Sequence, residues 1–267
     1  PMWVADMDFQ TAPCIIEALK KRVEHGVFGY TLVPDSYFEA ITNWFKRRHN
    51  WQIDRSWILY TSGVVPALTA SLQALTMPGE KVLIQTPAYN CFFTSIKNCG
   101  CEVAETALKR DGNSFVMDFD DFERKCADSK VTVFVLCNPH NPSGRVWEKE
   151  ELEQAMNVFK ENDVIVVSDE IWSDIIFTGY KHIPTYSISE DAKRRTISIY
   201  APSKTFNLAG LIGSYHIICD DYLREQLNKV ATSTHYNSMN VLSMHALIGA
   251  YREESIEWVD ELNQVLE

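Results

Sequence analysis

Short runs of apolar and β-branched residues alternate along this chain with longer segments whose apolar residues recur at helical spacing. The runs predicted to be strands are Lys81–Thr86, Val131–Asn138, Val164–Ser168, Thr196–Tyr200 and Ser214–Cys219. Several are apolar throughout, which is typical of strands covered by helices on both faces. Such alternation favours a mostly parallel sheet with right-handed crossovers. The predicted fold is therefore α/β, a three-layer sandwich with helices on both faces of the sheet.

The segments between the strands carry helical patterns. They are Pro13–His25, Ser36–Arg48, Pro66–Thr76, Tyr89–Asn98, Lys149–Asn162, Tyr222–Thr232 and Glu253–Glu267. In one of them Leu152, Met156 and Phe159 form an apolar stripe. No internal repeat, low-complexity linker or long block of charge divides the chain, so residues 1–267 are predicted to form one domain.

Neither end of the sequence has the features expected of a natural chain terminus. The sequence begins at Pro1 without an initiator methionine. The last predicted helix has Ile256, Val259, Leu262 and Val265 or Leu266 on one face, and no capping glycine or proline follows it. We therefore expect residues 1–267 to be a trimmed part of a longer protein.

Composition excludes several classes of partner. The net charge of −11 argues against nucleic acid or an anionic membrane surface, because both require clustered Lys and Arg. No apolar run approaches the roughly 20 residues that span a bilayer, and no signal peptide opens the sequence. The seven cysteines include no CxxC pair, so we expect reduced, mostly buried thiols in a cytoplasmic protein and no metal site.

Three predicted strands are followed by polar residues of different chemistry. Val131–Asn138 leads to Asn141, Val164–Ser168 leads to Asp169, and Thr196–Tyr200 leads to Lys204. The carboxyl ends of parallel strands lie at one edge of a sheet, which is where ligands bind in such folds. An amide, a carboxylate and an amine are therefore predicted to converge there.

These residue types suit an aldehyde cofactor such as pyridoxal phosphate (PLP). A lysine amine can attack the aldehyde, and a buried carboxylate can keep the pyridine nitrogen protonated. Ser62–Pro66 leads into a predicted helix, whose N-terminal N–H groups could hold the phosphate. Singly, each feature also has an ordinary explanation as a solvated lysine, a strand-end cap, a turn or a helix start. Their order and shared position favour the cofactor site.

Two sets of motifs resemble known families. Three blocks resemble the signatures of fold-type I PLP enzymes, the aspartate aminotransferase superfamily: Asn138–Gly144, Ser168–Ile171 and Ser203–Asn207. Three more resemble the narrower group of MalY/PatB-type cystathionine β-lyases, also called C–S lyases: Trp3–Phe9, Gly26–Tyr30 and Thr86–Tyr89. The resemblance covers essentially the whole chain and implies the large, PLP-binding domain of such an enzyme, without the small C-terminal domain.

The resemblance implies a role for each residue around the cofactor ring. Lys204 would form the Schiff base with PLP and act as the catalytic base. Asp169 would pair with the pyridine nitrogen, Asn141 would hydrogen-bond the ring hydroxyl oxygen, and Tyr89 would stack on the ring.

The resemblance also implies a phosphate site and a subunit arrangement. The Gly63 turn with the backbone amides of Val64 and Val65, and the Ser203 hydroxyl, would hold the phosphate. Tyr30 would reach the phosphate of the neighbouring subunit, so the implied active unit is a homodimer.

Three positions depart from the family pattern. Many aminotransferases have Tyr, and the lyases often have His, where this chain has Trp172, which cannot accept a hydrogen bond. A phosphate-binding Arg common in relatives is replaced by Ile212, and the second Tyr of the lyases' Tyr–Tyr pair is replaced by Asn90. The Arg that grips the substrate carboxylate in this superfamily is expected beyond the chain end.

The implied function is a carbon–sulfur β-lyase that converts cystathionine or a related cysteine S-conjugate to a thiol, pyruvate and ammonia. An aminotransferase is the nearest alternative, because it shares every step up to the Cα carbanion. Ile212 and the Trp3–Phe9 block favour the lyase. A regulatory protein that binds a transcription factor is a second alternative. Lys204, Asp169 and Asn141 argue against a purely non-catalytic one. The sequence leaves the exact substrate open.

Overall fold

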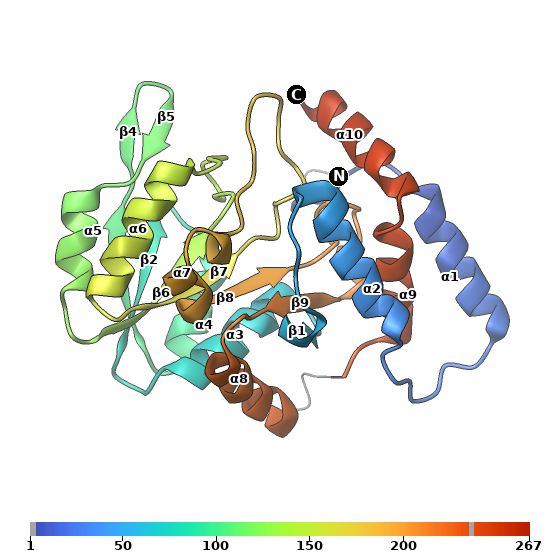
Figure 1. Cartoon of the computed structure of the whole chain (residues 1–267), viewed down its shortest axis with the longest axis horizontal. Helices are drawn as coiled ribbons and strands as arrows, with labels where there is room; N and C mark the ends of the chain where they lie inside the picture. The colour runs from blue at the N-terminus through green and yellow to red at the C-terminus, as the bar shows by residue number, and fades with distance from the viewer. Residues whose placement is uncertain (1–3, 235–237) are drawn as a thin grey trace.

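A seven-stranded sheet forms the centre of the computed structural model, which describes residues 4–234 and 238–267 (Figure 1). Its strands lie in the order β1-β9-β8-β7-β6-β2-β3. Their bounds are β1 Ile58–Thr61, β2 Lys81–Thr86, β3 Glu102–Ala107, β6 Val131–Cys137, β7 Ile165–Asp169, β8 Thr196–Tyr200 and β9 Ser214–Ile217. Only β9 runs against its neighbours among these strands, so the predicted mostly parallel sheet is confirmed.

Helices cover both faces of the sheet. They are α1 Pro13–His25, α2 Asp35–Trp44, α3 Val64–Leu75, α4 Asn90–Asn98, α5 Phe119–Cys126, α6 Lys149–Glu161, α7 Glu190–Arg195, α8 Asp221–Thr234, α9 Val241–Ala250 and α10 Glu254–Leu266. On β6, Phe134 and Leu136 join the core formed with α5 and α6, whereas Val133 and Val135 join the core formed with α3 and α4. This alternation is the two-faced burial expected of a strand between two helical layers, and it confirms the three-layer sandwich.

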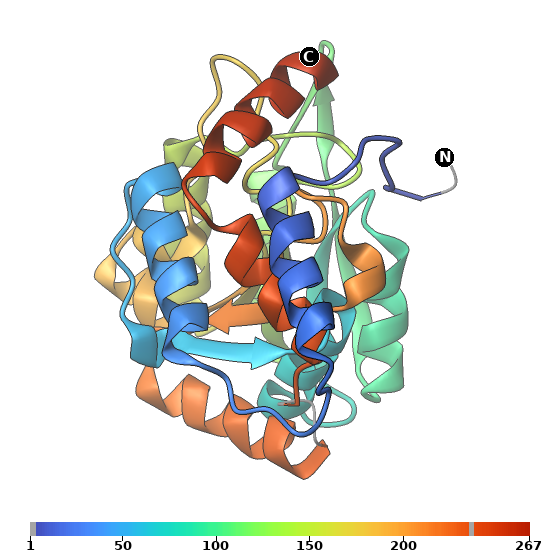
Figure 2. The same cartoon turned by 90° about the vertical axis from the view of Figure 1, so that its right-hand side faces the viewer.

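The helices α1, α2 and α9 pack over the β8, β9 and β1 part of the sheet, as Figure 2 shows from the side. Helix α9 was not predicted, because most of its residues are buried and it shows no apolar stripe. At Gly249 of α9, an added Cβ would lie 2.9 Å from the Cβ of Ala18, so the glycine lets α1 and α9 approach closely.

The predicted strands and helices are reproduced with small shifts at their ends. The unpredicted strands are β1, β3 and a separate hairpin of β4 Lys109–Asp111 and β5 Ser114–Val116; the unpredicted helices are α5, α7 and α9. In α10, Val259 and Leu262 are buried as expected, but Val265 and Leu266 are exposed, so the predicted apolar face is shorter. No helix in residues 4–234 or 238–267 is long and apolar enough to cross a membrane.

Candidate active site

The carboxyl ends of β6, β7 and β8 lie side by side. Asp169 at the end of β7 is in register with Cys137 of β6 and Ile199 of β8. The N–H of Asn138 donates to the carbonyl of Asp169 at 2.9 Å, which continues the pairing one residue past β6. The loops that carry Asn141 and Lys204 therefore begin on either side of Asp169, as the sequence predicted.

Asp169 is a buried carboxylate with few partners. Its Oδ1 accepts a hydrogen bond from the N–H of Ile171 at 3.2 Å. Burial raises the pKa of Asp169 from 3.8 to about 6; the Ile171 N–H lowers this pKa, the Glu170 charge raises it, and the Lys204 charge lowers it. Lys204 is therefore among the charges that act on Asp169.

Trp172 supplies the surface against which Lys204 lies. The Nζ of Lys204 is 5.6 Å from the centroid of the Trp172 ring, within the range of a cation–π contact. Trp172 thus presents an aromatic face beside the amine. No hydrogen bond or ion pair of the Lys204 amine occurs within the described ranges of the chain.

Tyr89 lies close enough to Asp169 for the carboxylate charge to act on the phenol. A hydrogen bond with Cys91, partial burial and the charge of Asp169 together raise the pKa of Tyr89 to about 12. Its ring makes an edge contact with Phe92, with 5.8 Å between centroids, and is 38% exposed. The phenol is therefore partly exposed beside the carboxylate.

The start of α3 forms a cradle of backbone N–H groups. Gly63 has a φ of +123°, and an added Cβ would lie 3.4 Å from Pro66 Cδ and 3.6 Å from Ile212 Cγ2. The Gly63 N–H donates to Ser214 Oγ at 3.0 Å, whereas Val64 and Val65 are first-turn residues whose N–H groups have no partner within the helix. This geometry suits a phosphate.

Asn141 lines a cavity of about 470 Å³ together with Trp172. The other residues of its wall are Asn113, Ser114, Pro139, His140, Pro142, Ser143, Gly144, Arg145, Val146, Ile175, Phe177 and Tyr180. The Asn141 N–H donates to Cys137 Sγ at 3.3 Å, which attaches the loop to the end of β6. Asn141 and Trp172 thus connect this cavity with the Lys204 side of the sheet edge.

The segment before α1 is attached to the Lys204 loop. The side chain of Asn207 donates to the carbonyl of Met7 at 2.8 Å and accepts from the Met7 N–H at 3.2 Å. Part of the Trp3–Phe9 block therefore lies beside the residues that follow Lys204. Trp3 itself is outside the described residues.

Two predicted residues have no hydrogen bond to this group within residues 4–234 and 238–267. Tyr30, between α1 and α2, is fully exposed and lines a groove with Phe28, Met239 and Asn240. Ser203 directly precedes Lys204 and is partly buried, and its carbonyl accepts from the N–H of Leu208 at 2.9 Å.

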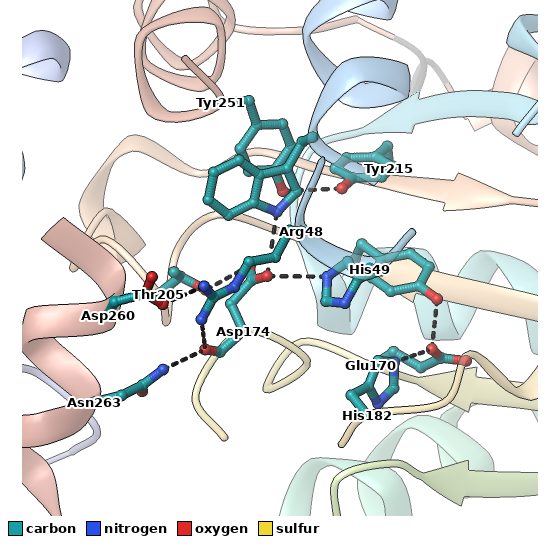
Figure 3. Close-up of polar contacts among 12 residues, drawn as sticks. Arg48, His49, Glu170, Asp174, His182, Thr205, Tyr215, Tyr251, Asp260 and Asn263 are labelled. Carbon is teal, nitrogen blue, oxygen red and sulfur yellow. Dashed lines mark hydrogen bonds and ion pairs between the residues drawn. The ribbon is translucent and has the colours of Figure 1, made fainter. Parts of the chain in front are cut away.

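Sequence analysis did not single out Glu170, which binds a buried polar network (Figure 3). Its carboxylate accepts from His182 Nε2 at 2.8 Å, Ser198 Oγ at 3.1 Å, the Thr185 N–H at 3.0 Å and the Tyr200 hydroxyl. Burial alone would raise the pKa of Glu170, but the hydrogen bond and charge of His182 and the other donors lower it below its ordinary value.

Asp174 is the second buried carboxylate that the sequence analysis missed. It accepts hydrogen bonds from His49 Nε2 at 3.0 Å, Trp44 Nε1 at 3.2 Å and Thr205 Oγ1 at 3.1 Å. Burial alone would raise the pKa of Asp174, but the His49 hydrogen bond, the His49 and Arg48 charges and the Thr205 hydroxyl lower it. The sequence did contain a signal for these two residues. Glu170 and Asp174 are carboxylates that closely follow a buried strand, in an otherwise apolar stretch.

No group of three or more His, Cys, Asp or Glu side chains is arranged for a metal ion in the part of the chain that the structure describes. The seven cysteines are unpaired: Cys14, Cys101, Cys126 and Cys137 are buried, and Cys91, Cys99 and Cys219 are partly buried.

This fold places a lysine, a carboxylate and an amide at the ends of neighbouring parallel strands, which is where α/β proteins commonly bind their ligands. A family model described as aminotransferase class I and II matches residues 4–267. The chain belongs to this family.

Individual relatives agree with the narrower resemblance. The chain is 40% identical to cystathionine beta-lyase PatB of Bacillus subtilis (strain 168), over all of this chain and 69% of PatB. It is 38% identical to cystalysin of Treponema denticola, whose crystal structure contains pyridoxal 5'-phosphate, with a TM-score of 0.95 over 98% of this chain and 66% of cystalysin. It is 33% identical to the PLP-bound C–S lyase of Staphylococcus hominis, with a TM-score of 0.92 over 99% of this chain and 66% of that one. The predicted resemblance to PatB-type proteins is confirmed.

Proposed function

We propose that this chain binds PLP and forms the cofactor side of a carbon–sulfur β-lyase. Its substrate would be L-cystathionine or a related cysteine S-conjugate, and its products a thiol, pyruvate and ammonia. The observation that carries the proposal is the position of the Lys204 amine, against Trp172 and within the field of the buried Asp169. The 40% identity to PatB supports the lyase reaction in particular.

The residues present fit the cofactor. Asp169 is buried, its pKa is raised to about 6, and it forms no ion pair within the described residues; a protonated pyridine nitrogen would supply that partner. The Gly63 turn leaves room where any other residue would place a Cβ, and α3 presents free N–H groups to a phosphate. When bound, PLP supplies an electron sink for the bond-breaking step.

Each residue of the proposed site then has a defined role. Lys204 Nζ would bind the cofactor aldehyde covalently, take the substrate Cα proton once displaced, and return a proton to the departing sulfur. Asp169 would keep the pyridine nitrogen protonated, which stabilises the charge that develops at Cα. Asn141 would hydrogen-bond the ring oxygen, and the Tyr89 ring would stack on the cofactor ring. Val64, Val65 and Ser203 would hold the phosphate.

The domain, the subunit arrangement and the cellular location are also part of the proposal. The chain spans 69% of PatB, which supports residues 1–267 as the cofactor-binding large domain, with the arginine for the substrate carboxylate supplied outside them. The full exposure of Tyr30, beside the exposed Phe28 and Leu32, supports a homodimer in which Tyr30 reaches the neighbouring site. The seven unpaired cysteines support a cytoplasmic location.

The test is a pair of incubations of the full-length protein with PLP. One contains cystathionine and the other an amino donor with a keto acid. Pyruvate and free thiol in equal amounts from the first incubation would support the lyase. Efficient keto-acid exchange without thiol release would instead establish the aminotransferase, and the lyase assignment would then be wrong.

A further inference from the structure

We propose that Asp174 is a positioning residue for Lys204, acting through the hydroxyl of Thr205. The inference rests on the proposed role of Lys204 in cofactor binding. It concerns the network behind the sheet edge and identifies what holds the lysine amine against Trp172.

The hydrogen bond from Thr205 Oγ1 to Asp174 Oδ2, at 3.1 Å, joins two chain segments that meet again at the active site. Thr205 directly follows Lys204, and Asp174 lies in the same turn as Trp172. The Lys204 amine and the Trp172 ring are themselves 5.6 Å apart. The Thr205–Asp174 bond therefore fixes the backbone next to Lys204 relative to the Trp172 turn, and with it the point from which the lysine side chain extends. Figure 3 includes Thr205 and Asp174 among the residues of this network.

Asp174 is in turn held by two donors on one side. Trp44 Nε1 and His49 Nε2 both donate to Oδ1, at 3.2 and 3.0 Å. The segment Phe45–His49 is a π-helix, which brings residues five apart onto the same side. In a regular α-helix each residue is rotated about 100° from the one before it, so positions 44 and 49 would lie about 140° apart around the helix axis. The local widening of the helix thus aims both donors at Asp174.

The backbone of Asp174 is fixed as well. Its carbonyl accepts from Asn263 Nδ2 of α10 at 3.0 Å and from Arg48 at 3.4 Å, and Arg48 also forms an ion pair with Asp260. Asp174 is 4% exposed, so loss of a donor cannot be repaired readily by water. With carboxylate and carbonyl both held, Asp174 is a rigid anchor for the Thr205 hydroxyl.

The Lys204 loop has few other side-chain anchors near the amine. Its turn is closed by backbone bonds from Phe206 to Pro202 and from Leu208 to Ser203, at 3.0 and 2.9 Å. Those bonds define the turn but not its distance from Trp172. Thr205 is fully buried, and its hydroxyl is the side-chain contact adjacent to the lysine that reaches the Trp172 turn.

The decisive variant is Thr205→Val, which keeps the shape of the side chain and removes the hydroxyl. The readout is the rate constant with which the visible absorbance of the Lys204–cofactor bond appears when PLP is added to the cofactor-free full-length protein. We expect this rate to fall about tenfold and kcat with cystathionine to fall tenfold to a hundredfold, because small misplacements of a reacting group have effects of about that size. KM should change less than twofold. Thr205→Ser, which restores the donor, should remain within threefold of wild type in both measurements.

Thr106→Val is the matched control. Thr106 is a buried threonine of β3, and its hydroxyl has no hydrogen-bond partner in the described residues. The substitution should leave the rate of cofactor attachment unchanged. A purely structural role for Thr205 would lower the unfolding temperature without slowing attachment, and that result would overturn the proposal.

Further results distinguish failure of the positioning role of Asp174 from failure of the proposed lyase function. If Thr205→Val does not fold, Thr205→Cys, with its weaker thiol donor, should slow attachment at least about threefold; a wild-type rate would overturn the proposal. Slower attachment in a protein that cleaves no cysteine conjugate would support the positioning role while contradicting the lyase. Wild-type attachment in Thr205→Val would contradict the positioning role even if the lyase reaction is observed.

Discussion

Asp169 and Glu170 are neighbours at the end of β7, yet they occupy opposite chemical environments. Asp169 lies toward Lys204 and accepts a hydrogen bond from Ile171, and burial raises its pKa to about 6. Glu170 lies on the other side of the strand and accepts four hydrogen bonds; although burial acts to raise its pKa, His182 and the other donors bring it below the ordinary value. Both carboxylates are buried, so the difference comes from the number of donors and the charges around them.

The comparison separates a proposed binding residue, Asp169, from a structural one, Glu170. A buried carboxylate with a full set of donors contributes to the fold, whereas one without them has unused capacity for a ligand. Lys204 and Asp174 differ in the same way. Lys204 faces Trp172 on the open side, while Asp174 belongs to the closed network behind it.

The largest expected effect is on cofactor binding and activity, from a substitution of Lys204. Lys204→Ala should abolish the visible absorbance of the bound cofactor and lower lyase activity by a factor of about a thousand or more, because the attacking amine is removed. The unfolding temperature of the cofactor-free protein should change by less than about 2 °C, since Lys204 is only partly buried. Lys20→Ala, at an exposed position of α1, is the control. Survival of the absorbance band in Lys204→Ala would show that the cofactor assignment is wrong.

Glu170→Gln should have the largest effect on the fold. Replacing the carboxylate by an amide sets an NH₂ group against the donors and should lower the free energy of unfolding at pH 7.5 by about 3 kcal/mol. The pKa of Glu170 is lowered in the folded protein, so its contribution is present above the unfolded pKa and is lost as the pH falls. Urea unfolding of the cofactor-free protein from pH 3.5 to 7.5 measures both effects. An unchanged stability at pH 7.5 would contradict the assignment of Glu170 to the structural side.

Asp169→Asn should change stability in the opposite direction. The pKa of Asp169 is raised from 3.8 to about 6, so the carboxyl stabilises the fold below pH 3.8 relative to higher pH, and this is lost as the pH rises through 6. The cofactor-free Asn variant should therefore be about 1–3 kcal/mol more stable than wild type at pH 7.5, and the gain should disappear near pH 4.

Asp111→Asn, at an exposed position of β4, controls for the change in net charge. Although more stable, the Asp169→Asn variant should bind PLP more weakly than wild type in a spectroscopic titration. A loss of stability at pH 7.5 would show that Asp169 is satisfied within the fold and would remove the contrast with Glu170.

A smaller effect is expected at the phosphate cradle. Gly63→Ala places a Cβ 3.4 Å from Pro66 Cδ in a backbone conformation, at φ +123°, that other residues rarely adopt. It should cost about 1–2 kcal/mol of stability and weaken PLP binding about tenfold. Gly210→Ala, where the added Cβ meets open space, should change neither quantity. Equal PLP affinity in the two variants would remove the start of α3 from the proposed site.

The central strands and the positions of the site residues could be predicted because they depend on local sequence. β2 and β8 have the predicted bounds, and β6, β7 and β9 differ from prediction by one or two residues at their ends. Edge strands were missed because β1 has only four residues and β3, with the sequence EVAETA, lacks a continuous apolar run. Helix α9 was missed for the opposite reason, since a helix buried on most sides has no stripe to detect.

By itself, the sequence determined a mostly parallel sheet with Asn141, Asp169 and Lys204 after three of its strands, because strand ends and parallel topology together bring such residues to one edge. Only the tertiary structure decided which buried carboxylate is satisfied. The partners of Asp174 on the α2 side lie 125 and 130 residues away along the chain, and Tyr200 lies 30 residues from Glu170. Hydrogen bonds between such distant side chains depend on how the helices pack against the sheet, and no local pattern of residues encodes that packing.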